Sequence, residues 1–141
     1  MQISNHYLPY TEKTLIILTN NEFAKLFSAF EREVEELEVM EVTTQIPKQR
    51  STGTPNSGPP DVDEIKRHSR MELYGDLSVR VLNLIKDGYT NVVLCAPEAY
   101  KNEIIDAMHT DVQNMIGDVI PKNLAMLPLD QVIRILQENR A

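Results

Sequence analysis

The chain has 141 residues, of which 42% are hydrophobic and 25% charged, as expected of one soluble globular domain spanning residues 1–141. Its net charge of −7 disfavours nonspecific nucleic-acid binding by the whole surface. No apolar run approaches the roughly 20 residues of a membrane span, and the N-terminal residues lack the basic start and apolar stretch of a signal peptide. A single cysteine, Cys95, excludes an internal disulfide, so we expect a cytoplasmic protein with no membrane contact.

The first 42 residues predict three strands. Residues 14–19, TLIILT, form a continuous apolar run, which indicates a strand buried on both faces. Asn20 and Asn21 form a turn signal, so residues 22–30 are predicted to be the hairpin partner, although their composition also suits a helix. Residues 33–42 fit both a helical step and an alternating pattern, and we choose a strand with a bulge that shifts the alternation.

A long helix is predicted after residue 61. Asp61 or Asp63 is suited to cap its N-terminus, and Gly88 is suited to end it. Apolar residues recur at steps of four and three, which is the pattern of a helix lying on a sheet; they are Leu73, Leu77, Val81 and Leu84.

The last third predicts two strands and three helices. Residues 91–96, NVVLCA, indicate a second fully buried strand closed by Pro97, and Cys95 inside it is interpreted as a buried, inert thiol. A helix over 98–109, with Ala99, Ile104, Ile105 and Met108 inward, precedes a short helix that starts at Thr110 or Asp111 and ends at Met115. Gly117 is expected to break that helix before a strand at 118–120, and a final helix over 129–139 buries Val132, Ile133 and Leu136.

This order of elements predicts an α/β fold. Strands joined by tight turns pair antiparallel, and strands reached through a helix run parallel. We therefore expect a mixed β-sheet packed with helices.

The common catalytic patterns are missing from the sequence. The three histidines, His6, His68 and His109, form no metal-binding pattern and are interpreted as surface residues. The stretch STGTPNSGPP lacks the lysine of a phosphate-binding loop, and the glutamates of residues 30–42 are interpreted as a solvated strand face. No metal or cofactor is expected, and nothing in these patterns identifies an enzyme.

Residues 46–70, IPKQRSTGTPNSGPPDVDEIKRHSR, contain a long loop and the start of the long helix. Loops above about 12 to 15 residues in a compact domain are generally functional or disordered, and we expect a flexible loop at about 46–62. A tolerated insertion explains its composition equally well. The segment is nevertheless a locally basic island on an acidic chain, with basic residues Lys48, Arg50, Lys66, Arg67 and Arg70 against Asp61, Asp63 and Glu64.

Several segments resemble the central domain of archaeal and eukaryotic class-1 peptide-chain release factors, and more closely its bacterial stand-alone relatives, the host attachment protein family. The similar segments are TLIILTNNEFAKLFSAF, IPKQR, the loop, the long helix, NVVLCAPEAYKNEIID and IPKNLAMLPLDQVIRIL. The resemblance covers residues 13–138 and depends on order and register more than on a signature motif.

This resemblance implies an RNase H-like fold without implying nuclease activity. In release factors the corresponding loop carries Gly-Gly-Gln, which orients water at the peptidyl-tRNA ester. Here the chain reads Ser-Thr-Gly-Thr-Pro after Arg50, so the catalytic role does not carry over. The resemblance still implies that the basic base of the loop and the start of the long helix bind RNA or another partner. These residues are Lys48, Gln49, Arg50, Lys66, Arg67 and Arg70.

Two functional hypotheses follow, and neither is enzymatic. The first is a translation-related module that binds the ribosome or structured RNA through residues 46–70. The second is a protein-interaction module of the host attachment family, binding a protein partner or a second copy of itself with no RNA contact. A release-type esterase ranks third.

Overall fold

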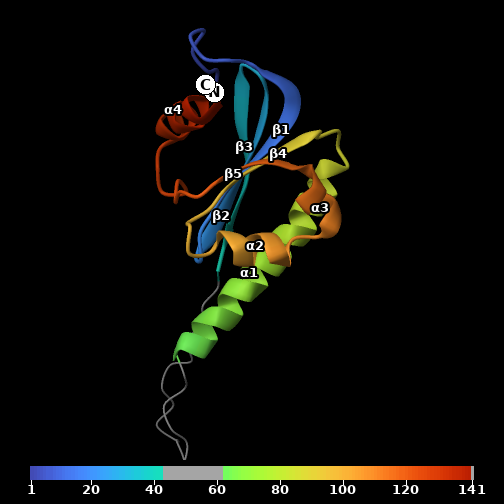
Figure 1. Ribbon diagram of the computed structural model, residues 1–141, viewed down its shortest axis with the longest axis vertical. Coiled ribbons are helices and arrows are strands. Elements are labelled where there is room, and N and C mark those ends of the chain that lie inside the picture. The colour runs from blue at the N-terminus through green and yellow to red at the C-terminus, as the bar shows by residue number, and fades with distance from the viewer. Residues whose placement is uncertain (43–61, 141) are drawn as a thin grey trace, which may run out of the picture.

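The structure, a computed structural model, describes residues 1–42 and 62–140 (Figure 1). In these residues the elements follow in the order β1 (Tyr10–Thr19), β2 (Phe23–Glu31), β3 (Glu33–Glu41), α1 (Val62–Ile85), β4 (Asn91–Cys95), α2 (Lys101–Ala107), α3 (Thr110–Met115), β5 (Ile116–Ile120) and α4 (Leu129–Arg140).

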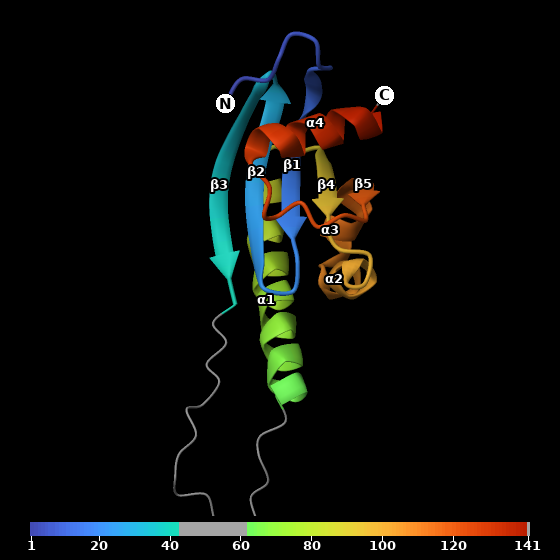
Figure 2. The same cartoon turned by 90° about the vertical axis from the view of Figure 1, so that its left-hand side faces the viewer.

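The described strands form one mixed sheet in the order β3-β2-β1-β4-β5 (Figure 2). β1 pairs antiparallel with β2 and parallel with β4, while β2 pairs antiparallel with β3 and β4 pairs parallel with β5. Helices lie on both faces: α1, α2 and α3 pack on one, and α4 packs on the other (Figure 1). The predicted fold class, a mixed sheet packed with helices, is confirmed.

β1 is the central strand, and its composition explains its place. Leu15 and Ile17 point into the core under α1, and Ile16 and Leu18 point into the core under α4. All four are fully buried, and burying each aliphatic side chain contributes about 1.5 to 3 kcal/mol. A continuous apolar run fits only a strand that is covered on both faces.

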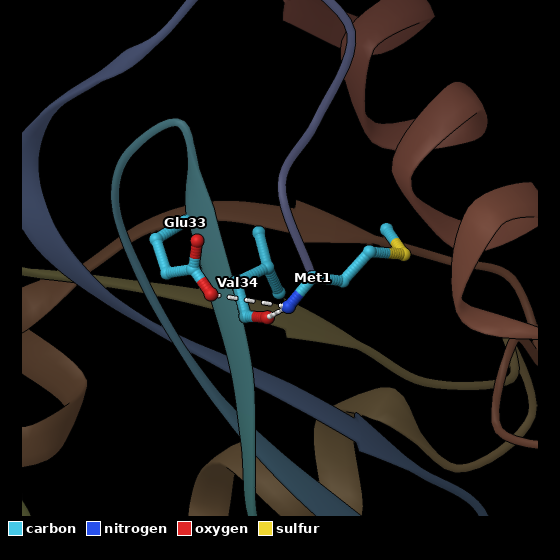
Figure 3. A network of polar contacts seen from close by, with 3 residues as sticks. All are labelled: Met1, Glu33 and Val34. Carbon is cyan, nitrogen blue, oxygen red and sulfur yellow. Dashed lines mark hydrogen bonds and ion pairs between the residues drawn. The ribbon is translucent and has the colours of Figure 1, made fainter.

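β3 forms one edge of the sheet and contains the predicted bulge. Leu26 of β2 faces Glu38 and Phe27 faces Glu36, so Leu37 is the extra residue. The first residues of the chain extend this edge: the Met1 ammonium donates to the Val34 carbonyl at 2.8 Å and to Glu33 Oε1 at 3.2 Å (Figure 3). The start of β3 is therefore paired on both sides.

Two predictions in the last third are wrong. α2 begins at Lys101 instead of residue 98, because residues 97–100 form a turn in which Tyr100 N–H donates to the Pro97 carbonyl at 3.0 Å; Ala99 is exposed as a result. Gly117 does not break an element before a strand but lies within β5, where the Asn91 side chain packs against its backbone. The buried residues predicted for α1 and α4 are confirmed.

Candidate functional site

A cleft of about 850 Å³ lies where several strands end and α1 begins. β1 and β3 run parallel to each other and end beside it, and the N-terminal turns of α1 extend beyond the strands (Figures 1 and 2). Ligands of open α/β sheets bind outside the carboxyl ends of strands, so this is the expected place for a site. The lining residues are Asn21, Glu22, Phe23, Glu41, Val42, Asp63, Lys66, Arg67, Arg70 and Tyr100.

The sheet-side wall is held by the turn between β1 and β2. Asn20 Oδ1 accepts hydrogen bonds from the backbone N–H of Glu22 at 2.8 Å and of Phe23 at 2.9 Å. The Thr19 hydroxyl donates to the Phe23 carbonyl at 3.1 Å. Asn suits this position because its side chain imitates a backbone turn. Phe23 is therefore carried on a fixed backbone at the rim of the cleft, and its ring packs against the core under α4.

The helix-side wall carries Lys66, Arg67 and Arg70, three of the six residues predicted as binding residues. A spacing of three or four residues places Lys66 and Arg70, and Arg67 and Arg70, on one face of α1. Lys66 and Arg67 are exposed, and neither is in an ion pair with another residue that the structure describes. Cations near the positive end of a helix gain nothing from its dipole, so the helix dipole does not explain them.

Arg70 differs from its two neighbours because it is bound within the protein. Its Nε donates to Glu103 Oε1 at 3.1 Å, and its guanidinium carbon lies 5.3 Å from the centre of the Tyr100 ring. The ion pair offsets the positive charge, and the ring contact adds a cation–π attraction. Arg70 therefore holds the Tyr100 ring in place, and its charge is less available to a ligand than the charges of Lys66 and Arg67.

Tyr74 lies one turn of α1 after Arg70 and belongs to the core on the α1 side of the sheet. Its side chain is fully buried, and among the described residues its hydroxyl has no hydrogen-bond partner. Burial, and next the nearby Glu103 carboxylate, raises the pKa of the Tyr74 phenol far above its ordinary value. The phenol is therefore neutral at physiological pH.

The charges of the lining are divided unequally between the two walls. Three lining residues are basic and three are acidic, which are Glu22, Glu41 and Asp63. Glu22 and Glu41 lie on the sheet side, whereas the three cations and Asp63 lie on α1. The basic island predicted from the sequence is thus only one wall of a cleft whose opposite wall is acidic.

The sequence did not identify Phe23, Tyr100 or the two glutamates as site residues. They are far apart in the chain, and only the sheet order brings them together. Lys48, Gln49 and Arg50, together with the predicted flexible loop at 46–62, lie almost wholly outside the described residues. Their role stays a prediction.

The described part of the chain offers few other groups for metal binding or nucleophilic catalysis. Its residues contain no group of three or more His, Cys, Asp or Glu side chains placed to hold a metal ion. His6, His68 and His109 are exposed, as predicted. Cys95 is fully buried, and burial raises the pKa of its thiol to about 12, so it is a neutral thiol. No helix in residues 1–42 and 62–140 has the length and apolar character to cross a bilayer.

Comparison with known proteins identifies solved structures with a similar fold. No family model and no curated protein matches the chain, so the resemblance to host attachment proteins stays a prediction. Among solved structures, an archaeal translation termination factor, aRF1, is similar with a TM-score of 0.55 and 14% identity over 90% of this chain. Dom34 of S. cerevisiae, a translation termination-like factor involved in RNA quality control pathways and interacting with Hbs1, has a TM-score of 0.51 and 12% identity over 94% of this chain.

A third similar structure, described as an archaeal protein, has a TM-score of 0.53 and 15% identity over 88% of this chain and 34% of its own length. The chain spans 38% of the length of aRF1 and 38% of Dom34. At these identities the similarity shows the fold alone. The predicted release-factor-like fold is confirmed to that extent.

Proposed function

We propose that the chain is a non-enzymatic, translation-related module that binds the ribosome or structured RNA. The observation that carries the proposal is the pair of exposed cations, Lys66 and Arg67, on one wall of a cleft at the carboxyl ends of the strands. The fold shared with part of an archaeal translation termination factor supports a role in translation. Lys48, Gln49 and Arg50 belong to the proposed binding surface through the sequence alone.

The physical basis is a local attraction between cations and phosphates. Lysine and arginine bind phosphate by charge-assisted hydrogen bonds, and each phosphate contact makes affinity more dependent on salt. Because the whole chain has a net charge of −7, the rest of the surface opposes RNA. Binding is therefore local, weak at physiological salt and stronger at low salt. A cytoplasmic location follows from the proposed partner.

Sedimentation with ribosomes at low salt tests the proposal. Wild-type protein is expected in the ribosomal pellet, and Lys66→Glu/Arg67→Glu is expected to remain in the supernatant. The matched control is Lys86→Glu/Arg134→Glu, which makes the same charge change at two exposed positions outside the cleft. Absence of the wild type from the pellet, or equal behaviour of the two double variants, contradicts the proposal.

Hydrolysis of peptidyl-tRNA is not part of the proposal. The sequence contains no Gly-Gly-Gln, which release factors use to orient water. The cleft residues that the structure describes are suited to binding, because they include cations and aromatic side chains and no activated nucleophile.

The second candidate function is protein recognition, and the edge strand β3 favours it. After its first residues this strand presents exposed Glu35, Glu36 and Glu41, with half-exposed Leu37 and Val39 between them. This acidic edge suits a basic protein segment that adds to the sheet as a further strand, or a basic surface of a second copy of the chain. Pull-down after RNase treatment separates the candidates: partners that persist favour protein recognition, and partners that vanish favour RNA.

A further inference from the structure

We propose that the cleft takes an unpaired nucleotide of RNA, with the base on the Tyr100 ring and the phosphate against Lys66 and Arg67. The inference rests on the proposed function, because it names the form of RNA that the same cleft takes. It distinguishes a single strand from a duplex, which the proposed function leaves open.

The size of the cleft suits one nucleotide or a few. Its volume of about 850 Å³ lies within the range of about 300 to 1,000 Å³ that is typical of small-molecule sites. A duplex keeps its bases stacked inside and presents only its outer surface. An unpaired base can enter a cleft and place its flat face on an aromatic ring.

Tyr100 is the ring best prepared for stacking. It is half-buried in the turn before α2, where its N–H donates to the Pro97 carbonyl at 3.0 Å and its carbonyl accepts from the Ile104 N–H at 3.0 Å. The Arg70 guanidinium lies over one face of the ring, 5.3 Å from its centre, and is itself held by Glu103, so the base takes the other face. A ring fixed in this way loses little conformational freedom when a base stacks on it.

Phe23 also lines the cleft, but its ring packs against the core under α4, and the Lys25 ammonium lies 5.8 Å from its ring centre on that side of the sheet. Stacking is therefore assigned to Tyr100, which packs on the α1 side and has the cations of α1 in the same cleft. An aromatic ring with neighbouring cations in one groove is the combination that single-stranded nucleic acids select.

The unequal charges of the two walls decide the orientation of the nucleotide. Phosphate is attracted to Lys66 and Arg67, although Asp63 in the first turn of α1 offsets part of their charge, and it is repelled by Glu22 and Glu41 on the sheet side. Carboxylates accept hydrogen bonds from the amino groups of bases, as they do from cytosine N4. The backbone therefore lies along α1 and the base edge points to the sheet. A duplex with a phosphate backbone on both sides meets the glutamates unfavourably.

Fluorescence anisotropy with the full chain tests the inference. The probes are a labelled eight-nucleotide RNA of cytidines and adenosines and the duplex of the same length. We expect the wild type to bind the single strand at least fivefold more tightly than the duplex. Tyr100→Leu is expected to weaken single-strand binding about tenfold and leave the duplex unchanged. Tyr100→Phe keeps the aromatic ring and should bind the single strand about as tightly as the wild type.

Tyr7→Leu is the matched control, because Tyr7 is a half-buried tyrosine outside the cleft. Should Tyr100→Leu fail to fold by circular dichroism, a strand with one 2-aminopurine reports stacking on the wild type. Its fluorescence should fall on binding, and unchanged fluorescence in a bound strand overturns the inference.

The outcomes separate this inference from the proposed function. Binding that needs Lys66 and Arg67 but is equal for both RNAs, or is unaffected by Tyr100→Leu, overturns the inference alone. A wild type that binds no RNA and no ribosome overturns the proposed function as well. A lysine-rich peptide that displaces the RNA and binds more tightly overturns the inference in favour of a protein ligand.

Discussion

Arg70 of α1 donates from Nε to Oε1 of Glu103 on α2 at 3.1 Å. The two side chains are only 19% and 30% exposed, so water screens this pair less than an ordinary surface ion pair. The contact joins two helices on the same face of the sheet, and it keeps the guanidinium over the Tyr100 ring. One interaction thus serves both the packing and the wall of the cleft.

Glu103→Gln is expected to lower the free energy of unfolding by about 1 kcal/mol, because Arg70 then loses its charged acceptor in a partly shielded place. Urea unfolding of this variant, of Arg70→Gln and of the double variant gives the coupling between the two side chains. Glu98→Gln is the control, since the Glu98–Lys101 pair involves a carboxylate that is 69% exposed and should change stability little. Fully additive effects of Arg70→Gln and Glu103→Gln contradict the prediction.

Tyr74→Phe removes a buried hydroxyl to which no described residue is hydrogen-bonded. Burying such a group unpaired costs about 1 to 3 kcal/mol, and removing it avoids that cost without changing the packing. We expect a melting temperature equal to or above that of the wild type. Tyr89→Phe is a comparison on the same core, and a clear loss of stability confined to Tyr74→Phe indicates that the hydroxyl has a partner.

The elements that the sequence predicted well are those whose burial alone determines their pattern. β1 and β4 are covered on both faces, so each is a continuous apolar run, and α1 has one buried stripe. A bulge in β3 was also predictable, because the apolar alternation shifts by one residue between Val39 and Met40, although the extra residue is Leu37. In each case the local pattern reflects a local cause.

Only the helix-side wall of the cleft could be predicted from the sequence, because the cleft as a whole depends on contacts between distant segments. A pattern reports which face of an element is buried but not which loop ends meet. Phe23 and Glu41 reach Lys66 and Tyr100 only through the order of the strands, and this order is a tertiary property. Gly117 shows the same limit, because it is needed where a neighbouring side chain approaches its backbone closely and not where a helix ends.

Gly117→Ala is expected to destabilise the protein by no more than about 1 kcal/mol, because the new Cβ overlaps with the Asn91 carboxamide across the β4–β5 pair and that carboxamide can turn aside. Asn91→Ala should remove most of this cost when both changes are combined. Gly75→Ala is the control: Gly75 lies in α1 with nothing near its missing Cβ, so alanine should stabilise by about 0.5 to 1 kcal/mol. Thermal unfolding that shows the same sign for both glycines contradicts the steric explanation.

Stability is expected to fall at alkaline pH, and Cys95 is the first cause. Burial, and then the nearby Asp118 carboxylate, raises the pKa of this thiol from its ordinary 9.0 to about 12. Between these values the unfolded chain releases the proton and the folded chain keeps it, so the free energy of unfolding decreases as pH rises. Each pH unit in this window costs about 1.4 kcal/mol for one such group.

The buried tyrosines Tyr10 and Tyr74 act in the same direction, because burial raises the pKa of each. Their ordinary pKa is 10.0, so they add to the loss only above about pH 10. Urea unfolding between pH 7 and about 10 therefore separates the thiol from the phenols. Cys95→Ala should be less stable at pH 7, because it leaves a small cavity, but should lose less stability between pH 9 and 10 than the wild type does. Parallel curves for the two proteins would show that the thiol ionises alike in the folded and unfolded chains.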